Sequence, residues 1–409
     1  MKIKLSALSA ALLLLMALPS FADTAKGEEA INKGDYATAV QELTDPVSKG
    51  DPKAEYLMAS LYYYGKGIAR DEQKAIDLLT SASKQGYTKA QSLLGLIYLD
   101  KNDYTNAVPL IQKAADAKDP DAYNSMGMLY EFGKGGMKQD YTQAYDWYQK
   151  AADTGNAQGE YNVGYMYESG KGVPMDLSKA ASWYTKAANK GNDKAQLELG
   201  YLYDNGKGVK QSYSEAVKWY TAAGNQGNII AQYNMALMYL SGDGVQKDAA
   251  KARDWLSKAA NQGDALSQLE LGYLYDSGQG GDQDFTQAFN WYMKAAQQGE
   301  PVAEYNVGDM YLVGDGVNKD YGKAIQWITQ SATAGYPKAQ YVLGTMYRDG
   351  IGVDKDLIQS YAWLSTAVAN GFTKGVDDRD QVAKSLNNDQ MQKASDLARQ
   401  YYEKYQPHE

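Results

Sequence analysis

A glycine-rich stretch with a lysine, LYDNGKGVKQ at 202–211, is the first segment whose residue types could do chemistry. Phosphate-binding loops follow a strand and have the pattern Gly-x-x-x-x-Gly-Lys-Ser/Thr, because their backbone amides converge on the anion. Here five residues separate Gly200 from Gly206, and Lys207 is followed by Gly208. This spacing argues against a phosphate loop and favours a turn that needs positive φ angles.

Other groups that could act as catalysts or metal ligands are scarce. The chain has no cysteine, which excludes thiolate zinc sites and cysteine nucleophiles. The single histidine, His408, is next to the last residue and does not suit a catalytic triad. The acidic loops at 241–248 and 313–320 lack the ligand spacing of a calcium-binding EF-hand and leave at most weak binding of a divalent ion. We expect no catalytic residue, no metal site and no cofactor.

The charge balance excludes one class of partner. The 409 residues carry 41 lysines and arginines against 50 aspartates and glutamates, for a net charge of −9. A chain with this excess of acid lacks the basic footprint that nucleic acid requires, and it would be repelled by anionic lipid. We expect no nucleic-acid partner.

The first 22 residues have the features of a signal peptide. Two lysines precede an apolar run over 5–18, and Ser20-Phe21-Ala22 supplies small residues for cleavage before Asp23. The run is too short for a lasting membrane span. Loss of the two lysines would change the net charge from −9 to −11. We expect an exported protein, periplasmic or secreted, without a membrane span.

Most of the chain is a repeat. The segment AQLELGYLYDNGKGV at Ala195 is followed by similar segments that start every 36 residues, and further copies lie upstream. All seven tryptophans occupy one repeat position. The nine copies share one tyrosine column, which consists of Tyr62, Tyr98, Tyr130, Tyr167, Tyr203, Tyr239, Tyr275, Tyr311 and Tyr347.

Each copy predicts a pair of helices. Ala195, Leu199 and Leu202 lie at i, i+4 and i+7, and the apolar residues over 213–223 repeat this helical spacing after the glycine loop. Gly227 stands where a left-handed residue ends a helix. Four prolines stand at the expected start of a first helix: Pro52, Pro120, Pro301 and Pro337. We call the two helices of a copy helix A and helix B.

Such hairpins bury their apolar faces only by stacking, so the pattern predicts an all-α fold, a right-handed α/α superhelical solenoid of helix-turn-helix repeats. Glycine recurs inside helix A at a cost of about 1 kcal/mol against alanine, which indicates close helix packing. We expect a signal peptide over 1–22, a capping helical hairpin over 23–53, nine repeats over 54–374, and capping helices with a tail over 375–409.

The pattern Ala-x-x-x-Leu-Gly-x-x-Tyr-x-x-Gly-x-Gly-Val, followed by Ala, Trp, Ala-Ala and Gly at fixed offsets, resembles the Sel-one-like repeat family, a variant of the tetratricopeptide repeat. The resemblance covers 54 to about 374. The second copy departs from it, because LDKNDY at 99–104 replaces the glycine loop and Leu110 replaces the tryptophan. The resemblance implies an adaptor that binds proteins or envelope components. Exported bacterial members are linked to the assembly of surface structures and to host interaction.

Two classes of function follow from the resemblance. The favoured one is a non-catalytic scaffold or adaptor of the bacterial envelope that binds a partner on a concave helix-A surface. The alternative is an envelope enzyme or a β-lactam- or peptidoglycan-recognising protein, since a cysteine-rich branch of the family is associated with β-lactams. The paired cysteines of that branch are absent here, which weakens the alternative.

The partner-binding residues are expected at the third, seventh and tenth positions of helix A, counted from the residue that opens each copy, because these positions form one stripe. Tyrosine there offers contact area and a polar tip for a protein or peptide, or for an envelope glycan. An alternative is that some of these tyrosines pack between neighbouring helices. The candidates from the fourth copy onward are Tyr161, Tyr165, Glu168, Tyr201, Asp204, Tyr233, Tyr273, Asp276, Tyr305, Asp309, Tyr341 and Arg348.

Overall fold

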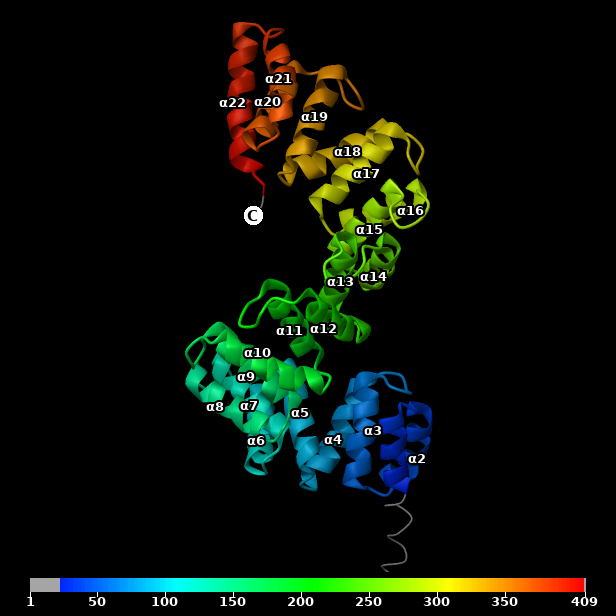
Figure 1. The fold of residues 1–409 in the computed structure, drawn as a ribbon, viewed down its shortest axis with the longest axis vertical. Coiled ribbons are helices and arrows are strands. Elements are labelled where there is room, and N and C mark those ends of the chain that lie inside the picture. Colours follow the sequence, from blue (N-terminus) through cyan, green and yellow to red (C-terminus); the bar gives the residue numbers. More distant parts are fainter. Residues whose placement is uncertain (1–22, 408–409) are drawn as a thin grey trace, which may run out of the picture. The chain divides into compact units, whose positions relative to one another are not determined.

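A computed structural model describes residues 23–407, and every regular element in that range is a helix (Figure 1). The expected signal peptide and His408 lie outside the described residues. The chain divides into two compact units. Unit 1 runs up to Ala195 and includes Lys207–Val209, and unit 2 comprises Gln196–Gly206 and Lys210 onward.

Within each unit, most consecutive helices pack against each other, which confirms the all-α solenoid. Residues 23–33 form a first helix. The helices of unit 1 that follow are α2 (Tyr36–Ser48), α3 (Pro52–Tyr64), α4 (Glu72–Lys84), α5 (Thr88–Asp100), α6 (Tyr104–Asp116), α7 (Pro120–Phe132), α8 (Tyr141–Asp153), α9 (Ala157–Ser169) and α10 (Leu177–Asn189).

The boundary between the units falls within α11 (Asp193–Asn205). Odd-numbered helices from α3 to α19 are helix A of their repeat, and even-numbered helices from α4 to α20 are helix B. The other helices of unit 2 are α12 (Tyr213–Asn225), α13 (Ile229–Ser241), α14 (Ala249–Asn261), α15 (Ala265–Ser277), α16 (Phe285–Ala296), α17 (Pro301–Val313), α18 (Tyr321–Thr333), α19 (Pro337–Asp349), α20 (Leu357–Ala369), a short 3₁₀ turn η1 (Thr373–Gly375), α21 (Val376–Ala383) and α22 (Asn388–Lys404).

Local sequence sets where the helices begin and end. In α7, Asp119 accepts hydrogen bonds from two backbone N–H groups of the first turn, and Pro120 occupies the first helical position. The helix ends at Gly133, whose φ of 60° places it in the left-handed region. The other three predicted prolines also stand at helix starts. Gly227, after α12, has the predicted positive φ, at 95°.

The glycine loop between helices A and B is a turn, as the sequence predicts. Gly206 and Gly208 have φ angles of 66° and 69°, a region that side chains with a Cβ rarely adopt. A Cβ on Gly208 would also collide with the carbonyl oxygen of Leu177, the first residue of α10. The second glycine of the loop therefore gives room to the backbone of the preceding repeat.

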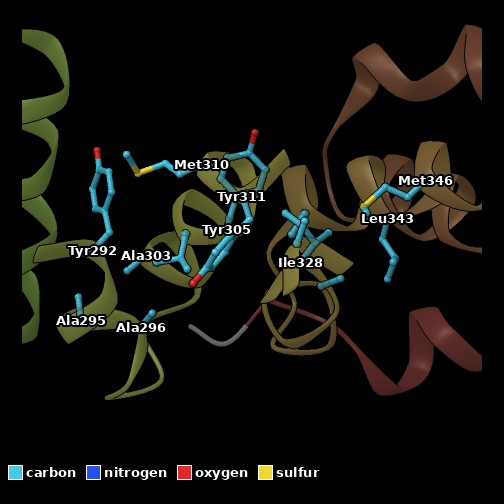
Figure 2. Close-up of a cluster of buried hydrophobic side chains, with 14 of the residues drawn as sticks. Tyr292, Ala295, Ala296, Ala303, Tyr305, Met310, Tyr311, Ile328, Leu343 and Met346 are labelled. Atoms are coloured by element: carbon cyan, nitrogen blue, oxygen red, sulfur yellow. The ribbon is translucent and has the colours of Figure 1, made fainter. Parts of the chain in front are cut away.

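The glycine inside helix A serves close packing against helix B. A Cβ on Gly272 of α15 would lie 2.6 Å from a ring carbon of Tyr292 in α16. Figure 2 shows part of the core of unit 2, in which Tyr292 and the alanines of α16 lie beside side chains of α17. Small residues therefore set the distance at which large ones interdigitate.

Further helices cover the two ends of the repeat array. Leu43 of α2 is buried in one cluster with Leu61 of α3. At the other end, the Tyr401 ring of α22 lies 4.4 Å from the Trp363 ring of α20, measured between centroids. Gln340 also donates a hydrogen bond of 2.9 Å to the Tyr405 carbonyl. The C-terminal segment is thus joined to the last repeat by both ring contacts and hydrogen bonds.

Across residues 23–407, no helix has both the length and the apolar character needed to cross a bilayer. The same range holds no group of three or more histidine, aspartate or glutamate side chains placed to share a metal ion.

Candidate binding surface

Two of the predicted tyrosines are open to solvent in unit 2. The Tyr273 side chain on α15 is 51% exposed, and the Tyr201 side chain on α11 is 38% exposed. Tyr233 on α13 is half-buried and packs against a core cluster that contains Leu271. Tyr201 and Tyr273 stand at the seventh position of their repeats, so this position is the one that presents aromatic surface.

Tyr305 differs from the expectation of an accessible tyrosine. Its side chain is only 5% exposed, and its ring meets the Tyr336 ring edge-on at 5.5 Å between centroids. The Lys338 ammonium lies 4.5 Å above the same ring. Figure 2 shows Tyr305 among the side chains of the core. Residues at the start of the next repeat cover it, so it packs between repeats, the alternative that the sequence left open.

The predicted acids at the tenth position face helix B. Glu168 accepts a hydrogen bond of 2.6 Å from the Tyr184 hydroxyl. Asp204 and Asp276 accept bonds of 3.4 Å from the equivalent tyrosines, Tyr220 and Tyr292. Burial raises the pKa of the Asp204 and Asp276 carboxyls. These acids therefore join the two helices of one repeat, which was not expected of them.

The remaining candidates of unit 2 either contact α21 or, like Asp309, are half-buried. The Tyr341 hydroxyl donates a hydrogen bond of 2.7 Å to Asp378 of α21, and Arg348 forms an ion pair with the same carboxylate. Burial raises the pKa of Asp309, while Lys338 opposes the shift. The C-terminal cap thus occupies the polar groups of the last repeat that we expected to meet a partner.

In unit 1, the predicted tyrosines are held by neighbours. The Tyr165 hydroxyl accepts a hydrogen bond of 2.7 Å from Lys171, which also contacts the buried Glu131 at 3.2 Å. The Tyr161 ring lies 5.6 Å from the Tyr184 ring. Lys171 is the middle residue of a Gly-x-Gly loop, so this loop lysine binds a carboxylate and a phenol of its own chain.

A cavity of about 520 Å³ opens on unit 1, which sequence reasoning missed. We call it the unit 1 cavity. Its lining comes from the A helices α3, α5, α7 and α9 and from Lys194 at the start of α11. The positional rule used for the later repeats would have located this cavity if it had been applied to the first three repeats, because their third and seventh positions all line it. These residues are Tyr56, Ser60, Ser92, Leu96, Asn124 and Met128.

A smaller apolar recess of about 150 Å³ adjoins the unit 1 cavity and shares Met128 with it. Leu99 and the 55%-exposed Phe132 also line the recess. Leu99 belongs to the repeat that lacks the glycine loop.

The sequence profile of the Sel1 repeat matches eight segments of this chain, at 52–87, 120–156, 157–192, 193–228, 229–264, 265–300, 301–336 and 337–372. The chain belongs to the Sel1 repeat family. Residues 88–119, which include the loop-less repeat, lie between the first two matches. Proteins built of Sel1 repeats are generally non-catalytic scaffolds that bind other proteins.

Two solved Sel1 repeat structures resemble this chain. One is a protective antigen present in uropathogenic Escherichia coli strains, with 31% identity, a TM-score of 0.51, and coverage of 97% of this chain and 94% of that one. The other is a Sel1 repeat protein from Oxalobacter formigenes, also with 31% identity and a TM-score of 0.51, which covers 59% of this chain and 96% of that one.

Curated relatives match over shorter stretches. An uncharacterized protein of Neisseria meningitidis is 31% identical over 100 residues, which are 24% of this chain and 21% of that protein. A component of an ERAD-associated E3 ubiquitin-protein ligase of Arabidopsis thaliana is 30% identical over 120 residues, which are 27% of this chain and 19% of that protein. The chain therefore spans about a fifth of the length of the curated relatives it matches.

Proposed function

We propose that this Sel1 repeat protein is an exported scaffold of the bacterial envelope that holds a protein partner on its helix-A face. One observation carries the proposal. The same stripe of helix A lines the unit 1 cavity and presents Tyr201 and Tyr273 to solvent in unit 2. Tyrosine is enriched at protein interfaces because a large apolar ring ends in a hydroxyl that can still hydrogen-bond.

The proposed location rests on the first 22 residues and on one relative. The lysines, apolar run and Ser20-Phe21-Ala22 have the order of a cleaved signal peptide. The similarity to a protective antigen of uropathogenic Escherichia coli extends over nearly the whole chain and agrees with an exported protein. Fractionation of cells that make the full chain should place it outside the cytoplasm with Asp23 as its first residue. A full-length product that stays in the cytoplasm would contradict this part of the proposal.

Capture with purified protein tests the proposed binding face. Protein that begins at Asp23 is immobilised, exposed to envelope extract, and compared with a Tyr201→Ala/Tyr273→Ala variant. We expect the variant to retain less than a tenth of the captured partner, because two interface tyrosines are together worth a few kcal/mol when a partner buries them.

The matched control is Tyr213→Ala/Tyr321→Ala, which removes two tyrosines of similar exposure (39% and 46%) from the starts of B helices. It should capture the partner as the unchanged protein does. Equal losses in both variants, or none in either, would count against the helix-A face. Circular dichroism checks that all variants keep their helices.

A further inference from the structure

A series of side-chain hydrogen bonds runs along the unit 1 cavity, and four of its six residues line the cavity. The Asn162 amide donates to Asn124 at 3.1 Å, and Asn124 donates to Asn156 at 3.0 Å. The series begins at the start of α11 and ends on a carboxylate of α7. In order from donor to acceptor, it consists of Asn192, Gln158, Asn162, Asn124, Asn156 and Asp121. We call this series the amide ladder.

The ladder is held in place by the backbone and by burial. Asn156 and Asn192 each accept a backbone N–H from the first turn of their helices, at 2.9 Å and 2.8 Å. The central Asn124 side chain is 6% exposed, and its neighbour Ser125 is 4% exposed. Buried amides with fixed partners keep one orientation, because any other leaves a polar group unsatisfied. The cavity therefore presents preorganised polar groups.

These groups match the polar groups of a peptide backbone. A primary amide carries two N–H donors and an acceptor oxygen with two lone pairs, and each ladder bond uses one donor. Asn124, Gln158 and Asn162 all line the cavity. The second N–H of such an amide would pair with a peptide carbonyl, and its oxygen would accept a peptide N–H.

The repeat spacing also suits an extended chain. Packed helices lie about 8–10 Å apart, and an extended strand advances about 3.3 Å per residue. A segment that crosses the A helices would thus place a peptide group on each repeat about every three residues. A sugar chain is commonly bound by stacking on aromatic faces in addition to hydrogen bonds. Among the lining residues only Tyr56 and Tyr64 are aromatic, and both stand on α3. This favours a peptide over a glycan.

Two features beside the ladder would select side chains of the segment. Lys89 and Lys194 are exposed at the rim of the cavity, where they would attract carboxylates. The adjoining recess around Leu99 and Phe132 has room for one apolar side chain.

We propose that the amide ladder grips the main chain of an extended segment of a partner protein, with an apolar side chain in the adjoining recess and an acidic one beside Lys89 or Lys194. This inference rests on the proposed scaffold function and names a site for it in unit 1. It predicts recognition that depends on peptide N–H groups at regular spacing more than on any single side chain.

A phage-displayed library of random dodecapeptides, panned on the protein that begins at Asp23, supplies the probe. Enriched peptides should contain an apolar and an acidic residue. Their affinity for Asn124→Leu/Asn162→Leu should fall at least tenfold, because leucine keeps the branched shape of the side chain and removes the donors and acceptors. Asn225→Leu/Asn261→Leu is the matched control, since both asparagines are exposed at the ends of B helices. It should bind as the unchanged protein does.

A second measurement needs no change in the protein. Each backbone nitrogen of an enriched peptide is methylated in turn, which removes one N–H donor. We expect the affinity of the peptide to fall about tenfold when methylation falls at certain positions, and these positions should lie about three residues apart. Uniform tolerance of methylation would overturn main-chain recognition even if the ladder variant failed to fold.

Other results separate this inference from the proposed function. Peptides that bind the ladder variant and the unchanged protein equally would overturn the inference alone, and so would the absence of any enriched peptide while envelope capture succeeds. If the protein bound a glycan and the ladder variant did not, the ligand of the site would be a sugar chain and not a peptide. Failure of both panning and capture would reject the scaffold function itself.

Discussion

At the scale of single residues, Glu304 carries a carboxyl group that is buried without a full set of hydrogen bonds. The side chain is 7% exposed, and its Oε2 atom has no hydrogen-bond partner within the described part of the chain. In four other repeats, glutamine at this position donates to a carbonyl eight residues earlier, as Gln268 does to Ala260 at 3.0 Å. An ionised glutamate cannot donate, so the equivalent carbonyl of Ala296 cannot receive this bond from Glu304.

Glu304 should make stability depend on pH. Burial, with a smaller contribution from Glu300, raises the pKa of its carboxyl from 4.5 to about 7. The folded protein thus binds a proton that the unfolded chain releases between these pH values. The free energy of unfolding should fall as the pH rises from about 4.5 to about 7, by about 2–3 kcal/mol from this group. Urea unfolding at pH 5 and pH 8 measures the change.

The variant Glu304→Gln should remove this contribution and should be more stable than the unchanged protein at pH 8, because an amide can donate to the Ala296 carbonyl. The control is Glu403→Gln, which changes an exposed carboxyl on α22 and should leave the pH dependence unaltered. A pH dependence in Glu304→Gln equal to that of the unchanged protein would show that Glu304 does not cause it.

A second residue-scale feature is the pairing of a helix-B tyrosine with a helix-A acid. The pair occurs four times, as Tyr148–Glu131, Tyr184–Glu168, Tyr220–Asp204 and Tyr292–Asp276. In the five repeats where helix B has leucine or isoleucine instead, the acid is also absent, as with Leu256 and Leu240. The two positions therefore vary together because a buried hydroxyl and a buried carboxylate each need a partner.

Variants of one pair test this dependence. Tyr184→Leu and Glu168→Leu should each destabilise the protein, and the double variant should lose less than the sum of the two by about 1 kcal/mol. The double variant reproduces the pair Leu256 and Leu240 of another repeat. Thermal and urea unfolding of the unchanged protein, the two single variants and the double variant measure the coupling energy between the two side chains. If the losses of stability simply added, the dependence would be contradicted.

At the scale of the helices, the distance between A and B depends on a glycine opposite a large ring. Gly272→Ala should cost about 1–3 kcal/mol, because its Cβ would overlap the Tyr292 ring and the ring is 1% exposed with no space to move. Adding Tyr292→Leu should recover much of the loss, since Ala236 and Leu256 already share one cluster in the preceding repeat. Thermal unfolding measures both steps. A harmless Gly272→Ala would show that the helices can separate freely.

At the scale of the whole molecule, a stack of repeats has open ends that must be covered. Trp363 is 4% exposed because the rings of Tyr401 and Tyr405 lie on it, at 4.4 Å and 5.4 Å between centroids. In a repeat protein, loss of one end weakens the neighbouring repeat most, since each repeat contacts only its neighbours.

Removal of residues 388–409 should therefore unfold α19 and α20 at a lower temperature than the rest of unit 2. Hydrogen exchange should show loss of protection in α20 first and little change in α13. The matched control is Tyr402→Ala, a substitution of a 41%-exposed tyrosine on α22, which should leave exchange unchanged. Uniform loss of protection across unit 2 would contradict the nearest-neighbour picture.

Much of the fold was predictable from the sequence because its determinants are local. Apolar spacing at i, i+4 and i+7, prolines at helix starts and glycines at helix ends each act within one or two turns. The site was less predictable. Tyr201 and Tyr273 are exposed as expected, yet Tyr305 is buried under the next repeat and Arg348 is engaged by α21. Such outcomes depend on which neighbour covers a residue.

The sequence alone determined the repeat, its helix pairs and its glycine turns. It also contained the Tyr–acid pairing, which could be found by comparing repeat positions. Only the tertiary structure decided where a cavity opens among the A helices. It also decided that six polar side chains of unit 1 form the amide ladder. Asn124 and Asn162 are 38 residues apart, and their contact depends on how successive repeats stack. That stacking is set by packing summed over many residues, which no short stretch of sequence specifies.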